Sequence, residues 1–389
     1  MAKKQKPKIL FSFVDAGLGH ITPTRGIADA FEKKYGKKCQ VIRSYVFKES
    51  QSQAVQKMGA LQDAHPKKLG SNKAFSFFEG LSYALPSKLV LFFLDRVFGK
   101  GRTDFFQDLK NLDADLVFST YYLPTHLAQQ ANKKGLTDSI VVSYAPDPYV
   151  YPAWDRKCDL MFVLNEQTKR QAIRRGYKKE QIEVVPFVYR SEITSTTLNE
   201  KNIRKKLGIE KGRYALLFTA GAHATAGAEK IIKEIVKKDL DLDFYIVCGK
   251  NQRMYDKMVE LSKSSTGKTN IKPLPFIDNL HEYMSVCNLA IGKSGLGTVM
   301  EAKYYGLPMI IFSEQSKVEQ ITAKYLSKNG IAIREHNVKK IIEIISRDVE
   351  NNGYANGLLK QEIIREQSGA EAVADRLFEL LKQKHPQLK

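Results

Sequence analysis

The sequence has few cysteines and no long apolar run, and both shortages narrow the class of protein. Its four cysteines are far apart among 389 residues and form no CxxC pair. A disulfide-dense secreted scaffold is therefore excluded, and we expect reduced core thiols in a cytosolic protein. No stretch of eighteen apolar residues occurs, so we expect no membrane-spanning helix. The apolar run at residues 9–14 is too short for a signal peptide.

Acidic residues are also in short supply. The chain holds 42 acidic and 62 basic residues, a formal net charge of +20, and residues 1–110 hold 20 basic residues against 9 acidic ones. This imbalance predicts an anionic partner, either nucleic acid or an anionic membrane face. A nucleic-acid-binding protein should interleave basic residues with stacking aromatics on a recognised module, and the sequence shows none. We therefore expect a membrane surface and no nucleic acid.

Short apolar runs alternate with helical patterns along both halves of the chain. This alternation is typical of β-α units stacked on a parallel sheet, so we expect an α/β fold. Strands are expected in the first half at residues 8–14, 39–44, 116–119, 140–144, 160–163 and 183–185. The series restarts in the second half with strands at residues 214–221, 243–250, 271–276, 289–292 and 309–312.

A polar, hydroxyl-rich segment after Pro186 separates the two series of strands and is the expected linker. We therefore expect two Rossmann-like, doubly wound domains, residues 1–190 and 191–389, that face a central cleft. The final helix, about residues 369–384, can pack back on the first domain. Ligands of such sheets bind at the carboxyl ends of the strands.

One segment, residues 66–102, interrupts the alternation with seven basic residues and many phenylalanines. Basic side chains beside bulky apolar ones describe an interfacial amphipathic element on an anionic bilayer. The alternative is a core helix with a solvated basic face. The density of phenylalanine favours the membrane element. Its expected membrane contacts are Lys67, Lys68, Phe77, Phe78, Phe92, Phe93 and Arg96.

The second half holds the more specific motif, LAIGKSGLGTVMEAKYYGLPMIIF. A strand ends at Gly292, a glycine-bearing loop follows, and a helix is expected to open near Thr298 with Glu301 in its first turn. Backbone N–H groups at a helix start attract phosphate, and a carboxylate one turn further in can accept hydrogen bonds from ribose hydroxyls. The alternative is a plain turn in which Glu301 only offsets the helix dipole.

Two further loops follow strands of the second half. LLFTAGAH places Gly221 and His223 after a strand, where small residues suit a phosphate cradle. LPFIDNL places Phe276 and Ile277 at another strand end, where the backbone can pair with a base edge while the phenylalanine ring packs against it. Taken singly, each loop is weak evidence for nucleotide binding.

Three motifs together, VDAGLGHITP, LLFTAGAH and GKSGLGTVMEAKYYGLPMII, resemble the processive diacylglycerol glycosyltransferases and monogalactosyldiacylglycerol synthases in order and spacing. The peptidoglycan GlcNAc transferase is a more distant relative. The resemblance runs from about residue 8 to 335. It implies a GT-B fold, a UDP-sugar donor, a lipid acceptor such as diacylglycerol, and inversion at the anomeric carbon. It also implies a metal-independent hexosyltransferase without a cofactor, peripheral on the inner face of the cell membrane.

The resemblance assigns roles on the donor side by position. Glu301 would bind the ribose, and Phe276 and Ile277 would flank the uracil. The residues implied to line the diphosphate are Ser294, Gly295, Gly297, Thr298, Gly221 and His223. Glu319, with Gln320 nearby, matches a residue that contacts the donor sugar, but the family's neighbouring Gln and Asn are replaced here by Val318 and Thr322. The identity of the donor sugar therefore stays open.

On the acceptor side, Gly17, Gly19 and His20 match the group's glycine-glycine-histidine core, and Asp15 matches a candidate base of the plant galactolipid synthases. A histidine near neutral pKa is the more usual proton acceptor, whereas an aspartate can serve if burial raises its pKa. Asp15 as base with His20 orienting the acceptor is one division of roles. A structural imidazole at His20 is the alternative, and Asp147 is the third candidate base.

The remaining signals are weaker. DLDLD, residues 239–243, looks like a doubled metal-binding DxD, but its position between a helix and a strand predicts a solvated turn and no metal. Histidines without a motif, among them His126, are expected to be incidental. Trp154 is expected either near the acceptor or in the core.

A UDP-sugar epimerase on the same fold is a rival function, and the basic, aromatic segment at 66–102 argues against it.

Overall fold

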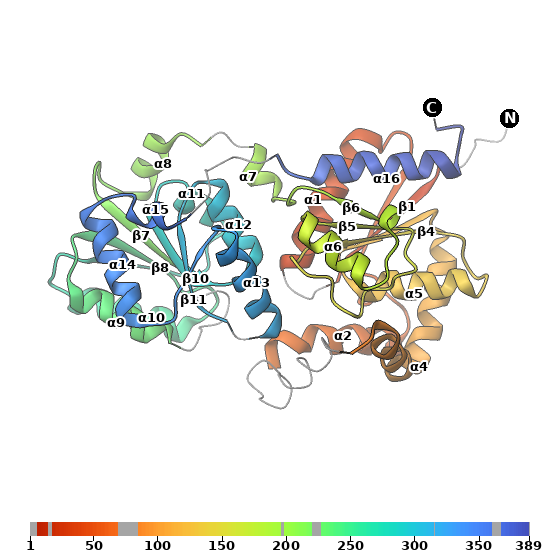
Figure 1. Cartoon of the computed structure of the whole chain (residues 1–389), viewed down its shortest axis with the longest axis horizontal. Coiled ribbons are helices and arrows are strands. Elements are labelled where there is room, and N and C mark those ends of the chain that lie inside the picture. The colour runs from red at the N-terminus through yellow and green to blue at the C-terminus, as the bar shows by residue number, and fades with distance from the viewer. Residues whose placement is uncertain are drawn as a thin grey trace. The chain divides into compact units, whose positions relative to one another are not determined.

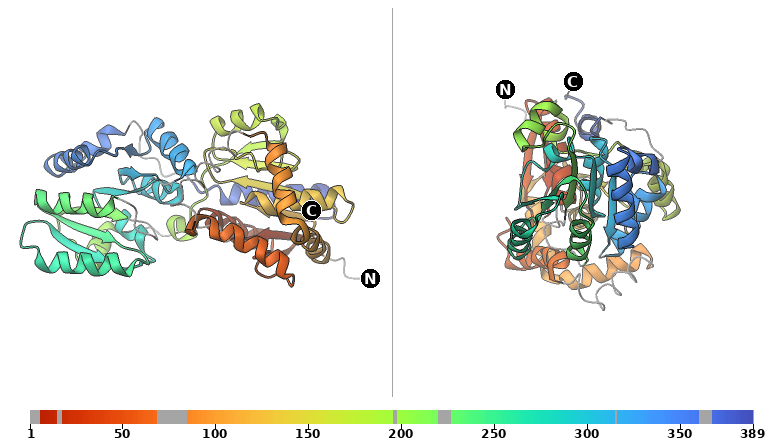
Figure 2. Two further views of the ribbon diagram at one scale, coloured as in Figure 1. Left: turned by 90° about the horizontal axis from the view of Figure 1, so that it is seen from below. Right: turned by 90° about the vertical axis from the view of Figure 1, so that its left-hand side faces the viewer.

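The computed structural model describes residues 6–14, 18–68, 85–195, 198–219, 227–314, 316–359 and 367–388. The chain divides into two compact units, one formed by Met1–Thr194 with Gln367–Lys389 and the other by Ser195–Glu366. The boundary between them falls in the polar segment after Pro186. Each unit is a six-stranded parallel sheet with helices on both faces (Figures 1 and 2).

The first unit has the strand order β2-β1-β3-β4-β5-β6. Its strands are β1 (Lys8–Ser12), β2 (Gln40–Ser44), β3 (Leu116–Ser119), β4 (Ile140–Ala145), β5 (Leu160–Val163) and β6 (Ile182–Val184). Its helices are α1 (Leu18–Tyr35), α2 (Gln53–Lys68), α4 (Ser87–Leu112), α5 (Tyr122–Lys133), α6 (Glu166–Arg174), the 3₁₀ helix η1 (Lys179–Gln181), α7 (Ser191–Ser195) and α16 (Ala370–Lys384). From β1 the next strand, β2, is added on one side, and β3 and all later strands are added on the other side. The switch point, where such sheets bind ligands, therefore lies between β1 and β3.

Alternating strand residues supply two cores, one on each face of this sheet. Leu10 and Val117 pack on the face covered by α2, α4 and α5. Ile9 and Phe118 pack on the opposite face, against α1 and α16. The strands are apolar on both sides because helices cover both faces, which is why the sequence shows them as continuous apolar runs.

The last helix, α16, belongs to the first unit although it follows the whole second unit in the chain (Figure 1). It lies along α1, where the rings of Phe378 and Tyr35 stack with centroids 4.0 Å apart. Asp375 receives hydrogen bonds from Lys34 at 3.0 Å and from the Tyr35 hydroxyl at 2.7 Å. The core between the sheet and α1, which contains Ile9 and Phe118, is therefore completed by α16.

The second unit has the strand order β12-β11-β10-β7-β8-β9. Its strands are β7 (Tyr214–Thr219), β8 (Leu242–Val247), β9 (Asn270–Leu274), β10 (Leu289–Lys293), β11 (Met309–Ser313) and β12 (Ile333–Arg334). Its helices are α8 (Glu200–Leu207), α9 (Ala228–Lys238), α10 (Gln252–Ser264), α11 (Leu280–Met284), α12 (Leu296–Tyr304), α13 (Lys317–Lys328), α14 (Val338–Glu350) and α15 (Tyr354–Leu358). The switch point here lies between β7 and β10.

The structure confirms the doubly wound α/β fold and differs from the sequence-based expectation in detail. The strand β12 was not expected, because two residues are too short to show an alternating pattern. The predicted solvated turn at 239–243 is wrong for Asp243, which lies inside β8 and is 3% exposed. Arg213 and Lys272 approach its carboxylate to 3.3 and 3.1 Å, so the charge is buried with its partners.

His126 is the main surprise of the first unit. This α5 residue is 4% exposed and bridges two carboxylates, with Nδ1 2.8 Å from Asp155 and Nε2 3.1 Å from Asp95. Burial favours the neutral form of all three groups, but their mutual contacts outweigh it, so the pKa of His126 is raised and the pKa values of Asp95 and Asp155 are lowered. The imidazolium therefore ties α4 to α5 and to the loop that carries Trp154, and the expectation that His126 is incidental is wrong.

We expect the His126→Ala variant to lower the free energy of unfolding of the first unit by about 3 kcal/mol, because it leaves the Asp155 side chain, 10% exposed, without its ion-pair partner, whereas Asp95 keeps Arg102 at 3.6 Å. Urea unfolding followed by the fluorescence of Trp154, the single tryptophan, monitors this unit. His385→Ala is a matched control, because His385 pairs with Asp115 in the same unit but both side chains are 22% exposed. Equal losses in the two variants would contradict the assignment.

The contribution of His126, Asp95 and Asp155 to the free energy of unfolding depends on pH. The raised pKa of His126 means that its contribution is complete below about pH 6.5 and is lost as the pH rises through the folded-state value. The lowered carboxyl pKa values mean that their contribution is complete above about pH 4 and is lost as the pH falls through the folded-state values. The difference between wild type and His126→Ala should therefore be largest between these limits.

Candidate active site

The switch point of the first unit is occupied by His20, in the first turn of α1. Its Nδ1 lies 2.8 Å from the carbonyl oxygen of Thr120, which follows β3. The Thr120 hydroxyl donates a hydrogen bond to the carbonyl oxygen of His20 at 2.7 Å, and the hydroxyls of Thr24 and Thr120 lie 2.8 Å apart. These bonds join the start of α1 to the end of β3 and fix the imidazole in place.

The bond to Thr120 also fixes the protonation of the ring. A carbonyl oxygen only accepts, so Nδ1 of His20 must carry the hydrogen that it donates. In the neutral ring Nε2 then bears the lone pair and can accept a proton. The His20 ring meets the ring of Tyr121 edge-on, with centroids 5.1 Å apart. The described geometry is therefore that of an oriented base.

Asp147 follows β4 at the same edge of the sheet. Burial raises the pKa of its carboxyl, and the charge of His20 acts in the opposite direction. Gly19 lies one residue before His20, and a Cβ placed on it would meet no described atom within 4 Å. Asp15 and Gly17 lie outside the described residues.

In the second unit the loop after β10 leads directly into α12. Gly295 is the N-cap of this helix, and Gly297 and Thr298 lie in its first turn. Ser294 is 1% exposed, and its hydroxyl has no hydrogen-bond partner among the described residues. Backbone N–H groups at a helix start, next to a buried hydroxyl without a described partner, can bind an anion.

Glu301 lies deeper in α12 than expected. The helix begins at Leu296, two residues before the expected start near Thr298, so Glu301 lies in the second turn and the prediction of a first-turn carboxylate is wrong. Its side chain is buried, with 8% of the residue exposed. The early start follows from Gly295, which caps the helix without a side chain. Glu301 nevertheless stays on the helix that carries the anion site.

Phe276 and Ile277 follow β9 at the same edge of the second sheet. Phe276 is 52% exposed, a large fraction for a phenylalanine. Lys250, after β8, places its Nζ 5.6 Å from the centre of the Phe276 ring. Sequence reasoning missed Lys250, which is the last residue of the strand predicted at 243–250. Gly221 and His223 lie outside the described residues.

Glu319 and Gln320 lie in the first turn of α13. Ser316 caps this helix and accepts a hydrogen bond from the backbone N–H of Glu319 at 3.1 Å. The carboxylate of Glu319 lies 3.1 Å from Nζ of Lys293, the last residue of β10, whereas Gln320 is exposed. Sequence reasoning named Glu319 and missed Lys293, because no spacing rule links residues 26 positions apart.

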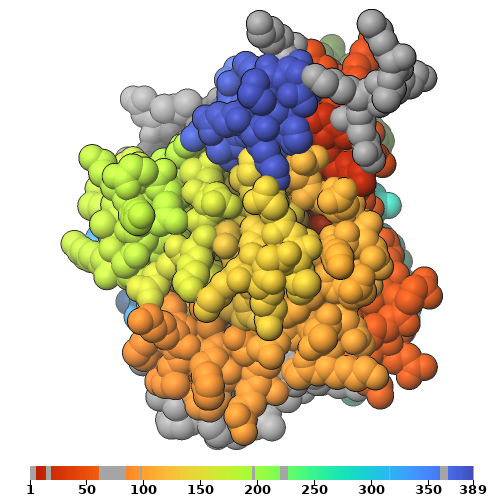
Figure 3. Space-filling view, turned by 90° about the vertical axis from the view of Figure 1, so that its right-hand side faces the viewer, coloured from red at the N-terminus to blue at the C-terminus, as the bar shows by residue number. Residues whose placement is uncertain are grey.

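The predicted membrane element corresponds in part to α4, which lies along one edge of the first unit with α16 at the opposite edge (Figure 3). Phe92 and Phe93 are 56% and 53% exposed, and Arg96 is exposed beside them. Gly99, with φ of 32°, breaks the helix after this pair. Lys67 and Lys68 end α2, and Phe77 and Phe78 lie outside the described residues. Among the described helices, none is long and apolar enough to cross a bilayer.

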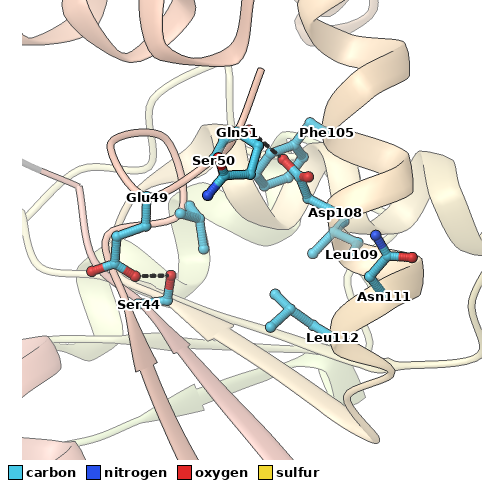
Figure 4. Close-up of a pocket in the computed structure, with 10 residues that line it drawn as sticks. Ser44, Glu49, Ser50, Gln51, Phe105, Asp108, Leu109, Asn111 and Leu112 are labelled. Atoms are coloured by element: carbon cyan, nitrogen blue, oxygen red, sulfur yellow. Dashed lines mark hydrogen bonds between the residues drawn. The ribbon is translucent and has the colours of Figure 1, made fainter. Parts of the chain in front are cut away.

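A cavity of about 290 Å³ opens between the end of β2, the following loop and the second half of α4 (Figure 4). Its polar groups are paired with one another, Glu49 with Ser44 at 2.6 Å and Asp108 with Ser50 at 2.6 Å. None of the predicted site residues lines it. The bond between Asp108 and Ser50 fastens α4 to the loop that follows β2.

Two family models match the chain. Residues 20–186 match monogalactosyldiacylglycerol (MGDG) synthase, and residues 216–376 match the glycosyltransferase family 28 C-terminal domain. The "Probable monogalactosyldiacylglycerol synthase, chloroplastic" of Nicotiana tabacum is 24% identical over 360 residues, 87% of this chain but 64% of that protein. The "Processive diacylglycerol beta-glucosyltransferase" of Bacillus cereus is 24% identical over 330 residues, 85% of this chain and 82% of that protein.

Solved structures show the same fold at low identity. MurG of Acinetobacter baumannii is 13% identical with a TM-score of 0.61, over 96% of this chain and 99% of that one. HepE of Anabaena, solved in complex with UDP-glucose, is 13% identical with a TM-score of 0.52, over 98% of both chains. One region of the chain thus matches an MGDG synthase model and another matches a family 28 C-terminal domain model, and the solved structures show that the fold is GT-B.

Proposed function

We propose that this protein is a membrane-associated, inverting, metal-independent glycosyltransferase that moves a hexose from a UDP-sugar to diacylglycerol or a glycosyl-diacylglycerol. The observation that carries the proposal is the presence of both family domains in one chain. The names of the relatives supply the acceptor class, and the HepE complex supplies the donor class. The exposed Phe92 and Phe93 suit a protein that works on lipids at the inner face of the cell membrane.

The proposed reaction is a single displacement. The acceptor hydroxyl oxygen attacks the anomeric carbon from the face opposite UDP, the bond from that carbon to the diphosphate oxygen breaks, and its electron pair leaves with UDP. The acceptor proton passes to a base of the first unit. We assign this role to Nε2 of His20, because the Thr120 carbonyl fixes the required tautomer. Asp147 sits within reach of its charge, and Asp15 is the competing base.

We assign donor binding to the second unit. The diphosphate occupies the start of α12 at Ser294, Gly295, Gly297 and Thr298, Glu301 accepts hydrogen bonds from the ribose, and Phe276 with Ile277 contacts the uracil. Gly221 and His223 would lie beside the diphosphate, and Gly17 and Gly19 beside the acceptor. Glu319 and Gln320 would contact the sugar.

The test is a transfer assay in which a panel of UDP-sugars is offered to extracted lipids and the products are identified by mass spectrometry. Transfer of one hexose or several to diacylglycerol supports the proposal. Intact UDP binding without transfer to any lipid contradicts it. Conversion of the UDP-sugar in the absence of any acceptor would instead support an epimerase.

Membrane binding gives a separate prediction. Replacing Phe92 and Phe93 by serine should lower the partition coefficient onto anionic vesicles at least about tenfold, because each ring loses its apolar burial in the bilayer. Co-sedimentation with vesicles measures this change. Leu136→Ser is the matched control, because Leu136 is an exposed apolar residue of the same unit, 37% exposed and remote in sequence from α4. Misfolding of the double variant, or unchanged sedimentation, would contradict the membrane role.

A further inference from the structure

A lysine directly precedes the loop at the start of α12, to which we assign the diphosphate. Lys293 is the last residue of β10, one residue before Ser294. The pairing between β10 and β11 shifts register between Gly292 and Lys293. Such irregularities re-aim the side chain at the end of a strand. Gly292 itself admits no side chain, since a Cβ there would lie 2.5 Å from Met309 and from Thr219.

Among the residues that the structure describes, the ammonium of Lys293 pairs with the carboxylate of Glu319. Its Nζ lies 3.1 Å from Oε1 of Glu319, and the two side chains are 37% and 19% exposed. Glu314, at the end of the neighbouring strand β11, has its own cations, with Arg334 at 2.8 Å and His336 at 2.9 Å. Glu319 is therefore the carboxylate that holds Lys293. A partly exposed pair of this kind is weak, so its members can exchange partners at low cost.

The loop after Lys293 carries no charge of its own. Residues 294–298 are Ser, Gly, Leu, Gly and Thr, and the attraction of this loop for an anion rests on backbone N–H groups and the unsatisfied Ser294 hydroxyl. During transfer the electron pair of the breaking bond goes to the diphosphate, whose negative charge grows. A cation next to this loop stabilises that charge directly.

We propose that Lys293 is the cation that binds the diphosphate of the donor, and that Glu319 is its counter-ion in the empty site. When UDP-sugar binds, the ammonium moves from the carboxylate to the phosphate oxygens, and the Glu319 carboxylate then accepts hydrogen bonds from the sugar hydroxyls. This inference rests on the donor site proposed above. It makes Lys293 a binding and catalytic residue, and Glu319 its competitor for the same charge.

Calorimetric titration of the full chain with UDP and with uridine tests the exchange. Lys293→Gln should weaken UDP binding about 10- to 100-fold, the value of a hydrogen-bonded charge pair, and leave uridine binding unchanged. Lys293→Arg should restore most of the UDP affinity. Glu319→Gln should tighten UDP binding a few-fold, since it removes the competitor for the Lys293 ammonium, and this gain should vanish when Lys293 is already Gln.

The exposed pair of Lys257 and Glu229, 2.8 Å apart on α10 and α9, is the matched control. Its two Gln variants should leave UDP binding unchanged. UDP affinity in Lys293→Gln equal to that in Lys257→Gln, or an equal loss for uridine and UDP, would overturn the role of Lys293. Weaker UDP binding in Glu319→Gln would overturn the competition. If the wild type binds neither ligand, the proposed donor site itself is wrong.

Discussion

Replacing His20 by asparagine is expected to lower kcat for sugar transfer about 100- to 10,000-fold, the usual cost of losing a general base. Asparagine keeps a side-chain N–H that can donate to the Thr120 carbonyl, which now accepts from Nδ1 at 2.8 Å. It lacks the second ring nitrogen that takes the proton. Donor affinity should be unchanged, because the proposed donor site lies in the other unit. Steady-state kinetics with a calorimetric measurement of UDP binding separates the two quantities.

Asp15→Asn and Asp147→Asn are the comparison variants. If His20 is the base, its variant should lose the most activity. Near wild-type turnover in His20→Asn would show that the imidazole only fixes the loop. A larger loss in Asp15→Asn than in His20→Asn would transfer the role of base to Asp15.

Glu301→Gln is expected to raise the KM for the UDP-sugar and the Kd for UDP about 10- to 100-fold. A carboxylate that accepts hydrogen bonds from ribose hydroxyls contributes about 1.5–3 kcal/mol, and the amide replaces one acceptor by a donor. Glutamine keeps the volume of this buried side chain, 8% exposed, so the helix should stay intact. Vesicle binding should not change, because Phe92 and Phe93 lie in the first unit.

A ligand without ribose hydroxyls isolates the contact. The 2′,3′-dideoxy analogue of UDP should bind the wild type and Glu301→Gln with equal affinity. An equal loss for UDP and for this analogue would mean that Glu301 only supports the fold of α12. Unchanged KM and Kd in the variant would remove Glu301 from the site.

The strands other than β12 followed from the sequence, because buried parallel strands are continuous apolar runs between glycine-bearing or polar loops. The loops after β9 and β10 were located for the same reason, and Glu301 and Phe276 with them. The start of α12 was misjudged by two residues, since Gly295 caps the helix without a side chain that would mark the position. A difference of one or two residues between the expected and observed ends of a helix is normal.

The contacts that the sequence concealed are those between distant residues. His126 meets Asp95 and Asp155 across 31 and 29 positions, and Lys293 meets Glu319 across 26. No local periodicity records such a pairing, because it depends on how strands and helices stack. A histidine or lysine without a motif is therefore uninformative in sequence, and its role appears only when the fold places a carboxylate beside it.

The return of α16 to the first unit sets the order in which the chain can complete its folding during synthesis. The second unit is continuous from 195 to 366 and needs no later residue. The first unit has to wait for Val373, Leu377 and Leu381, all fully buried against it. Until the ribosome has synthesised α16, the apolar face of α1 stays uncovered. The unit synthesised first is thus the one finished last.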